Sequence, residues 1–376
     1  MTDQVEKACV IPGMAEYPRN HWYVIAFSRE VGRALMRRDC LGDPVLLYRT
    51  AEGEPIALFD RCPHRGMPLS MGRLLGDVVQ CGYHGFEYDS AGVCIKVPSQ
   101  DAVPATMCVH RYPLVEKWQW LWIWMGDPAL ADPALIPDHR ELGLEDPSLT
   151  SEPYFILPID ANYLLALENL VDATHITYLH EGNFDTGNVA AAPARLEQQG
   201  TLVRMIREFK NEPVPPMIRE MLSLKGDRVD RSLILDNYSL NMFVVRFIFT
   251  EPDYPETGER VNNLVIAVTP GGPKSVYQFA AMAQTIPDRR PNRIQELETV
   301  LRQDKVALEA IQQMFDQLGP ERCPEFSVKA DANSLRTRSM IAEMVEAERA
   351  TESNGARPKP LRRRSDRAVA SERAFR

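Results

Sequence analysis

Long hydrophobic runs are absent from this 376-residue chain, although 44% of its residues are hydrophobic. No apolar run approaches the roughly 20 residues that span a bilayer. Residues 1–17 also lack the basic segment followed by an apolar one that marks a secretory leader. Short, interrupted apolar runs are typical of a globular interior. We therefore expect a cytoplasmic protein with no membrane association.

A concentrated excess of positive charge is also missing. The 43 Lys and Arg residues are outnumbered by 52 Asp and Glu residues, which gives a formal net charge of −9. Nucleic-acid binding needs basic side chains gathered on one face, so we expect no nucleic-acid partner. The Arg run at residues 362–364 lies in a segment without apolar periodicity, and we interpret residues 351–376 as a basic, disordered tail.

Cysteine is sparse, and most of it is scattered. Disulfides persist mainly in oxidising compartments, so scattered cysteines fit a reducing environment better. We expect them to be ordinary buried or free thiols. Five of the seven cysteines show no pairing pattern, namely Cys9, Cys40, Cys94, Cys108 and Cys323.

The other two cysteines belong to a patterned segment. Cys62 and His64 are followed, after sixteen residues, by Cys81 and His84, so that each of two tight loops offers one thiolate and one imidazole. Two ligands of each kind fit tetrahedral zinc or a Rieske [2Fe-2S] cluster, in which two Cys hold one iron and two His hold the other. Zinc hairpins usually repeat one spacing or place both His on a helix. The mixed loops seen here favour the iron-sulfur cluster.

The segments around these loops resemble the Rieske non-haem iron oxygenases. The resemblance is carried by residues 62–70, CPHRGMPLS, and residues 81–86, CGYHGF. It extends from about Arg19 to the helix near Asp304, and it is strongest to the vanillate O-demethylase and dicamba monooxygenase branch. It implies an oxygenase (alpha) component that assembles as a head-to-tail homotrimer.

The first part of the chain predicts an all-β Rieske domain at residues 18–125. A single core stops growing at about 250 to 300 residues, so we expect two domains. Short apolar runs at residues 21–26, 44–49 and 55–59 read as antiparallel strands, with a hairpin turn at residues 51–54.

Residues 118–124, WQWLWIW, place four tryptophans at a spacing of two, on one face of a strand. This pattern is compatible with an aromatic wall beside a cofactor or with a domain core, and we favour the core. We predict that the strand closes the N-terminal domain.

The remainder of the chain predicts a second, α+β domain. Residues 126–153 are rich in proline and read as a linker, which leaves residues 154–350 for the catalytic domain. A helical pattern at residues 164–180 is followed by alternating β segments at residues 203–249 and 261–283. The pattern itself indicates only α+β, whereas the resemblance implies a helix-grip (START-like) fold.

Two of the seven histidines, His175 and His180, lie five residues apart in the helical segment. Five residues of regular helix turn by about 140°, so both side chains can face one metal only if the helix ends or bulges between them. The spacing excludes the i, i+4 pair of zinc proteases. Ordinary core or surface histidines are the alternative, but the cluster motif upstream favours metal ligands.

A late helix supplies a carboxylate for the same site. Apolar residues recur at steps of three and four between residues 294 and 318, and Asp304 lies in the middle of this stripe. A carboxylate that faces a core needs a metal, a cation or a donor network. Two His and one carboxylate form the facial triad of mononuclear Fe(II) sites. We predict the triad His175, His180 and Asp304, with a buried ion pair of Asp304 as the alternative.

Asp172 and Asn169 are the candidate catalytic-site residues that do not bind metal. Asp172 lies three residues before His175, where a continuous helix would place its carboxylate against the imidazole. The resemblance implies a further role, because the matching Asp of the family bridges a cluster-ligating His of a neighbouring subunit to an iron-ligating His. Asn169 matches a family position near the iron. An ordinary surface Asp is the alternative for Asp172.

These features predict the oxygenase component of a Rieske monooxygenase system, which uses dioxygen to oxidise a small aromatic substrate. No Gly-x-Gly-x-x-Gly follows a strand-like segment. Electrons should therefore come from NAD(P)H through a separate ferredoxin or flavin reductase. We expect O-demethylation or hydroxylation of an aromatic acid.

Two other functions stay open. One is a ring-hydroxylating dioxygenase that forms a cis-diol with the same metals. The other, from a different class, is a Rieske electron carrier or a zinc-stabilised ligand-binding module without oxygenase activity. Arg246, within an apolar strand, is a candidate to bind a substrate carboxylate. We favour an internal salt bridge or a position at an exposed edge over that role.

Overall fold

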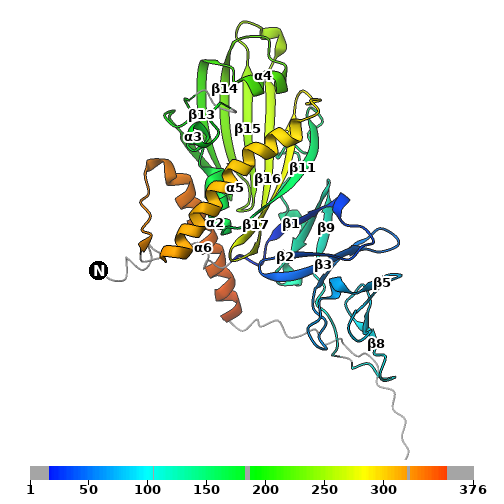
Figure 1. Cartoon of the computed structure of the whole chain (residues 1–376). Helices are drawn as coiled ribbons and strands as arrows, with labels where there is room; N and C mark the ends of the chain where they lie inside the picture. The colour runs from blue at the N-terminus through cyan, green and yellow to red at the C-terminus, as the bar shows by residue number, and fades with distance from the viewer. Residues whose placement is uncertain (1–16, 105, 183–186, 320–321, 354–376) are drawn as a thin grey trace, which may run out of the picture.

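The computed structural model describes residues 17–104, 106–182, 187–319 and 322–353 (Figure 1). Most of the predicted basic tail, residues 354–376, lies outside this part of the chain. None of the helices within it is both long and apolar enough to cross a bilayer.

The N-terminal domain is built only from strands and short 3-10 turns, as predicted. One three-stranded antiparallel sheet has the order β1-β10-β9, a second has the order β2-β3-β4, and a four-stranded sheet, β5-β6-β7-β8, lies at the far end of the domain (Figure 1). The strands are β1 (Trp22–Phe27), β2 (Met36–Cys40), β3 (Asp43–Arg49), β4 (Pro55–Phe59), β5 (Arg73–Leu75), β6 (Val78–Gln80), β7 (Glu87–Tyr88), β8 (Cys94–Lys96), β9 (Leu114–Lys117) and β10 (Trp120–Trp124).

The C-terminal domain is a seven-stranded antiparallel sheet with the order β11-β17-β16-β15-β14-β13-β12. Helix α5 (Arg293–Leu318) crosses one face of this sheet, with α2 (Tyr163–Val171) and α6 (Ala332–Ser353) beside it (Figure 1). This arrangement is the α+β architecture that was expected. The strands are β11 (Thr150–Ile159), β12 (Arg195–Gln199), β13 (Leu202–Pro213), β14 (Arg228–Asn237), β15 (Met242–Thr250), β16 (Arg260–Gly272) and β17 (Ser275–Gln284).

The tryptophan-rich strand β10 connects the two domains. Alternation along the strand places Trp120, Trp122 and Trp124 on one face, and all three are at most 1% exposed. They form one core with Trp22 and with apolar side chains of β15, β16 and β17 from the C-terminal sheet. The tryptophans are therefore core residues, but the core is shared between the domains.

The elements differ from the predicted ones in several places. Strand β11 begins at Thr150, inside the segment interpreted as linker, and its prolines are tolerated because β11 is an edge strand. The helical segment 164–180 forms two helices, α2 and α3 (Ile176–Leu179), rather than one. Helix α4 (Pro216–Leu222) interrupts the β segment predicted at residues 203–249, and α6 follows the late helix.

Candidate functional site

The two cluster loops have the same backbone geometry. The N–H of Cys62 donates to the carbonyl of Met67 at 2.8 Å, and the N–H of Cys81 donates to that of Phe86 at 2.8 Å. In each loop the glycine four residues after the cysteine, Gly66 or Gly85, closes a turn onto the cysteine carbonyl and has a positive φ, of 79° or 72°. Glycine adopts this conformation without the strain that a Cβ would impose.

The four proposed cluster ligands are brought together with the thiols inside and the imidazoles outside. Cys62 and Cys81 are buried, and the Tyr88 hydroxyl lies 3.2 Å from the Cys62 sulfur. The rings of His64 and His84 lie at the surface with centroids 4.6 Å apart. The buried Nδ1 atom of His64 has no hydrogen-bond partner among the described residues, so a metal bond would satisfy it.

This donor set fits a Rieske cluster. Two buried sulfurs can hold one iron, and two imidazoles facing outward can hold the other. Burial raises the pKa of the Cys81 thiol, with the nearby Cys62 acting in the same direction. A metal bond would stabilise the Cys81 thiolate against this effect.

The second centre lies between α3 and α5. His175 directly precedes α3 and His180 directly follows it, so only one short helical turn separates them and His180 itself has left the helical conformation. Both rings can therefore face the same point. Nε2 of His180 lies 3.1 Å from Oδ1 of Asp304, and Nε2 of His175 lies 3.5 Å from the same oxygen. The three donor atoms lie within 4.8 Å of one another. They fit a mononuclear iron held by two His and one carboxylate.

Neighbouring amides orient these donors. Asn169, on α2, donates from Nδ2 to Oδ1 of Asp304 at 3.0 Å, and Gln303 Oε1 lies 2.8 Å from Nδ1 of His180. Burial lowers the pKa of His175 despite the nearby Asp304 carboxylate. At His180 the same burial effect is outweighed by a hydrogen bond that the protonated ring donates to Asp304 and by the charge of that carboxylate, so the pKa is raised.

Asp172 is not placed as the sequence analysis expected. Helix α2 ends at Val171, so Asp172 caps the helix and does not share a helical face with His175. Its carboxylate accepts hydrogen bonds from the N–H and the hydroxyl of Thr174, both at 2.7 Å. Nδ1 of His175 is buried without a hydrogen-bond partner in the described part of the chain. Asp172 thus lies beside the ligand but is oriented by Thr174.

A cavity opens from the mononuclear centre into the C-terminal domain. It measures about 780 Å³ with its mouth included, and its lining includes all three triad residues, Asn169 and Asp172. Much of the remaining wall is apolar, with side chains such as Met217, Leu235, Val245, Phe247, Leu264 and Ile266. This composition suits an aromatic ligand.

Arg246 does not line the cavity. Its neighbours Val245 and Phe247 do, and alternation along β15 turns Arg246 to the opposite face of the sheet. There its guanidinium donates to the carbonyl of Glu141 at 3.1 Å and lies 3.7 Å from Asp236. The substrate role suggested for Arg246 is not supported by this position.

Three residues of the site were missed by the sequence analysis: Gln303, Thr174 and Asn262. Gln303 is adjacent to Asp304 in a polar stretch of helix, and Asn262 is one of two adjacent asparagines near the start of a long strand. Neither residue stands in a sequence pattern that marks it as part of a metal or substrate site. Thr174 had a local signal, because an Asp side chain that accepts from the N–H two residues later competes with the helical backbone hydrogen bonds.

A cluster-binding β domain joined to a helix-on-sheet domain with a two-His, one-carboxylate centre defines the Rieske non-haem iron oxygenases. Residues 21–113 match the Rieske [2Fe-2S] domain family, and residues 159–347 match the vanillate O-demethylase oxygenase C-terminal domain family. The chain belongs to this vanillate O-demethylase oxygenase family. Its cofactors are a Rieske [2Fe-2S] cluster and a mononuclear non-haem iron.

Known proteins of several activities resemble the chain. It is 31% identical to a vanillate O-demethylase oxygenase subunit of Pseudomonas sp. over 82% of this chain and 96% of that protein. It is 40% identical to the iron-sulfur subunit of a toluene-4-sulfonate monooxygenase system of Comamonas testosteroni, over 57% of this chain and only 61% of that subunit. Dicamba monooxygenase bound to 3,6-dichlorosalicylic acid superimposes with a TM-score of 0.80 at 28% identity, covering 89% of this chain and 100% of that one.

Proposed function

We propose that this protein is the terminal oxygenase of a Rieske monooxygenase system that oxidises a small aromatic substrate by O-demethylation or hydroxylation. The observation that carries the proposal is the cavity whose apolar wall ends at the three converging donors His175, His180 and Asp304. An electron carrier or a zinc-stabilised module would need no such cavity beside a second metal centre.

The chain's own residues hold and orient the reacting groups. Cys62, Cys81, His64 and His84 hold the cluster, and the triad holds the iron, which supplies dioxygen activation when it is bound. Asn169 and Gln303 fix the direction of two triad side chains through their hydrogen bonds. The apolar wall positions the ring of the substrate and excludes water.

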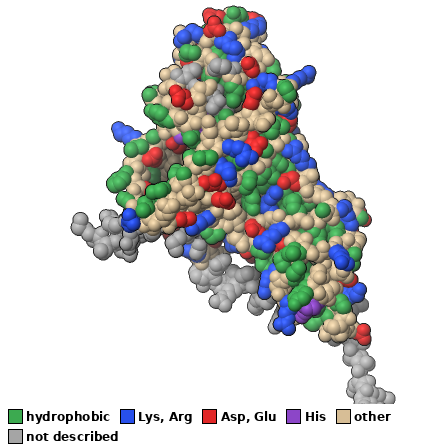
Figure 2. Space-filling view, in the orientation of Figure 1, with side chains coloured by type: hydrophobic (Ala, Val, Ile, Leu, Met, Phe, Trp, Pro, Cys, Tyr) green, Lys and Arg blue, Asp and Glu red, His purple; other side chains and the backbone are tan. Residues whose placement is uncertain are grey.

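Electrons would reach the iron from the cluster of a neighbouring subunit in a homotrimer. Asp172 also lines a second hollow, on the outer side of the metal centre, together with Asn169 and His175. At the cluster end of the molecule hydrophobic, basic and histidine side chains gather on the surface (Figure 2), and the Tyr83 side chain beside His84 is 63% exposed. We infer that this end enters the second hollow of the next subunit and that Asp172 bridges the two centres.

A separate reductase or ferredoxin would deliver the electrons in the cytoplasm. The test is an oxygen-uptake assay with a supplied reductase and a panel of methoxylated and unsubstituted aromatic compounds. We expect substrate-dependent oxygen uptake together with formaldehyde or a monohydroxylated product. Formation of a cis-diol would instead identify a dioxygenase. Lack of oxygen uptake with every aromatic compound, while the reductase still reduces the cluster, would contradict the proposal.

A further inference from the structure

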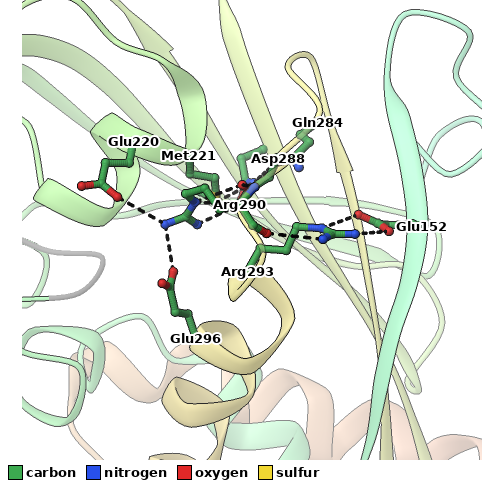
Figure 3. Close-up of polar contacts among 9 residues, drawn as sticks. Glu152, Glu220, Met221, Gln284, Asp288, Arg290, Arg293 and Glu296 are labelled. Carbon is green, nitrogen blue, oxygen red and sulfur yellow. Dashed lines mark hydrogen bonds and ion pairs between the residues drawn. The ribbon is translucent and has the colours of Figure 1, made fainter.

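The rim of the cavity holds two arginines, Arg290 and Arg293, and both are engaged by carboxylates of the protein (Figure 3). Arg290 forms a two-point contact with Asp288, with its Nε 3.0 Å from Oδ1 and its Nη2 2.7 Å from Oδ2. Its remaining nitrogen, Nη1, lies 2.8 Å from Glu296. Each nitrogen of the Arg290 guanidinium therefore already contacts a carboxylate of the protein.

Arg293 is engaged in the same way. Its Nε and Nη2 atoms lie 2.9 Å from the two carboxylate oxygens of Glu152, on edge strand β11 (Figure 3). Among the described residues that line the cavity, these two arginines are the only basic side chains apart from histidine. Both cations in this part of the cavity wall are therefore already paired with carboxylates, which offsets their attraction for an anionic substrate.

The Asp288 carboxylate fixes Arg290 in place. Its side chain is 2% exposed, and a buried carboxylate that loses its guanidinium partner is left with an uncompensated charge. A substrate anion would have to withdraw Arg290 from Asp288 at this cost. Arg290 is therefore a structural part of the cavity wall, and we do not expect it to bind the anionic group of a ligand.

The charge balance at the rim is negative. Besides Asp288, Glu296 and Glu152, a fourth carboxylate, Glu220 of α4, lies 3.8 Å from Arg290 (Figure 3), so four carboxylates surround two guanidinium groups. At the other end of the cavity Asp304 and Asp172 offset the charge of a ferrous ion. A carboxylate or sulfonate that enters would meet net repulsion at the rim.

The neutral polar group Asn262, on β16, favours hydrogen-bond donors over acceptors. One contact of its amide nitrogen is to Oε1 of Gln284 at 3.0 Å, and the other is to the sulfur of Met221 at 3.6 Å. With both N–H groups engaged, Asn262 can offer a ligand only its carbonyl oxygen. An acceptor of this kind suits an amide N–H or a hydroxyl and disfavours a carboxylate.

We propose that the cavity selects an uncharged aromatic substrate that carries an N–H or O–H donor, and that it discriminates against aromatic carboxylates and sulfonates. This inference rests on the proposed oxygenase function and departs from the aromatic acid expected from the sequence. Discrimination comes from the excess of carboxylates around the paired arginines at the rim and from the acceptor oxygen of Asn262.

The test compares two ligands of the same size and shape, 4-methoxybenzamide and 4-methoxybenzoate. Each is titrated calorimetrically into the full-length holoprotein under anaerobic conditions, where no turnover occurs. We expect the amide to bind at least about tenfold more tightly than the acid, with 4-methylbenzenesulfonate as weak as the acid. Equal or tighter binding of the acid or the sulfonate would overturn the inference.

Rim variants supply an independent test. Asp288→Asn should leave Arg290 with unused positive charge and raise the affinity for 4-methoxybenzoate at least about fivefold relative to the amide. Glu296→Gln, at a half-exposed position, should act in the same direction and serves if Asp288→Asn does not fold. The control is Glu298→Gln, which removes the same charge from an ion pair with Arg302 outside the cavity.

The outcomes separate this inference from the proposed function. If neither rim variant gains affinity for the acid relative to the amide, the rim carboxylates do not set the selectivity and the inference is wrong. Oxygen uptake driven by an aromatic acid would then still support the oxygenase. If no aromatic compound of either charge binds or drives oxygen uptake, both proposals fail together.

Discussion

The imidazole of His180 is hydrogen bonded to Gln303, the residue directly before Asp304, with 2.8 Å between Nδ1 and Oε1. Because an amide oxygen only accepts, the ring carries its proton on Nδ1. Its Nε2 lone pair then faces the metal position, 3.1 Å from Asp304. A single stretch of α5 thus supplies one ligand and fixes the tautomer of another.

Replacing Gln303 should loosen the iron. Gln303→Leu removes the acceptor, and outer partners of this kind typically contribute about 10- to 100-fold to metal affinity. Gln303→Glu keeps an acceptor oxygen and should retain iron. The measurement is iron content after dialysis against graded chelator, with the visible bands of the cluster as an internal control. Equal retention in the leucine variant and the parent protein would contradict the role of Gln303.

Loss of one cluster ligand should remove the cluster and spare the other iron. Cys62→Ser and His84→Ala each delete one of four donors, and the two loops share no residue with the triad. We expect the visible Rieske absorption to disappear while about one iron per chain remains. A variant that keeps its absorption bands would show that the ligand was wrongly assigned.

Asp304→Ala should have the opposite effect. Two imidazoles without the carboxylate bind Fe(II) weakly, so we expect loss of the mononuclear iron and a fall in turnover of more than about 100-fold. The cluster should still be reduced at the normal rate by its reductase. Full activity in this variant would eliminate Asp304 as a ligand.

Asp172→Asn should slow electron transfer without releasing either metal. The charge-assisted hydrogen bond that we assign to Asp172 at the subunit boundary is weakened, which corresponds to a rate loss of about tenfold or more. Stopped-flow oxidation of the reduced cluster by oxygen and substrate measures this step. Thr174→Val, which removes the hydroxyl donor to the same carboxylate but keeps the backbone N–H donor, should slow it less. Unchanged kinetics in Asp172→Asn would refute the bridge, and loss of iron would make Asp172 a structural support.

His139 should make the fold sensitive to acid. The ring is fully buried between Trp120 and Trp122, and burial, aided by the charge of Lys117, lowers its pKa to about 3. Between pH 6.5 and 3 the unfolded chain binds a proton that the folded chain excludes. Stability is therefore lost as the pH falls through this window, by about 2 kcal/mol at pH 5.

The matching experiment compares thermal unfolding of the parent protein and His139→Leu at pH 7.5 and 5. The difference between the two midpoints should be smaller in the variant, because the leucine does not titrate. Other groups contribute equally to both proteins and cancel in the comparison. An identical pH dependence would show that His139 does not control acid stability.

The candidate metal donors could be proposed from the sequence because their signals are local. Loop spacing predicted the two Cys and two His of the cluster, one carboxylate in an apolar stripe predicted Asp304, and the structure brings the members of each set together. Asp172 was misplaced because its hydrogen bonds to Thr174 end the helix that a continuous pattern would have extended. The direction of Arg246 was undetermined, since β15 is apolar on both faces and gives no preferred side.

The arginines of the rim could not have been found from the sequence. Arg293 meets Glu152 across 141 positions of the chain, and only the folded sheet and helix bring the two residues together. In sequence, Arg290 and Asp288 read as ordinary charged residues of a loop. Whether a cation is free or neutralised is a property of tertiary structure.

The tryptophan core has a consequence for the construction of hybrid oxygenases. Because Trp120, Trp122 and Trp124 pack directly on strands of the C-terminal sheet, the proline-rich segment is a covalent joint but not a structural boundary. If the cluster domain of a relative were joined at that segment, its core side chains would not match those of β16 and β17. We expect a hybrid to fold when the tryptophan strand and the strands of the C-terminal sheet that pack on it are taken from the same parent.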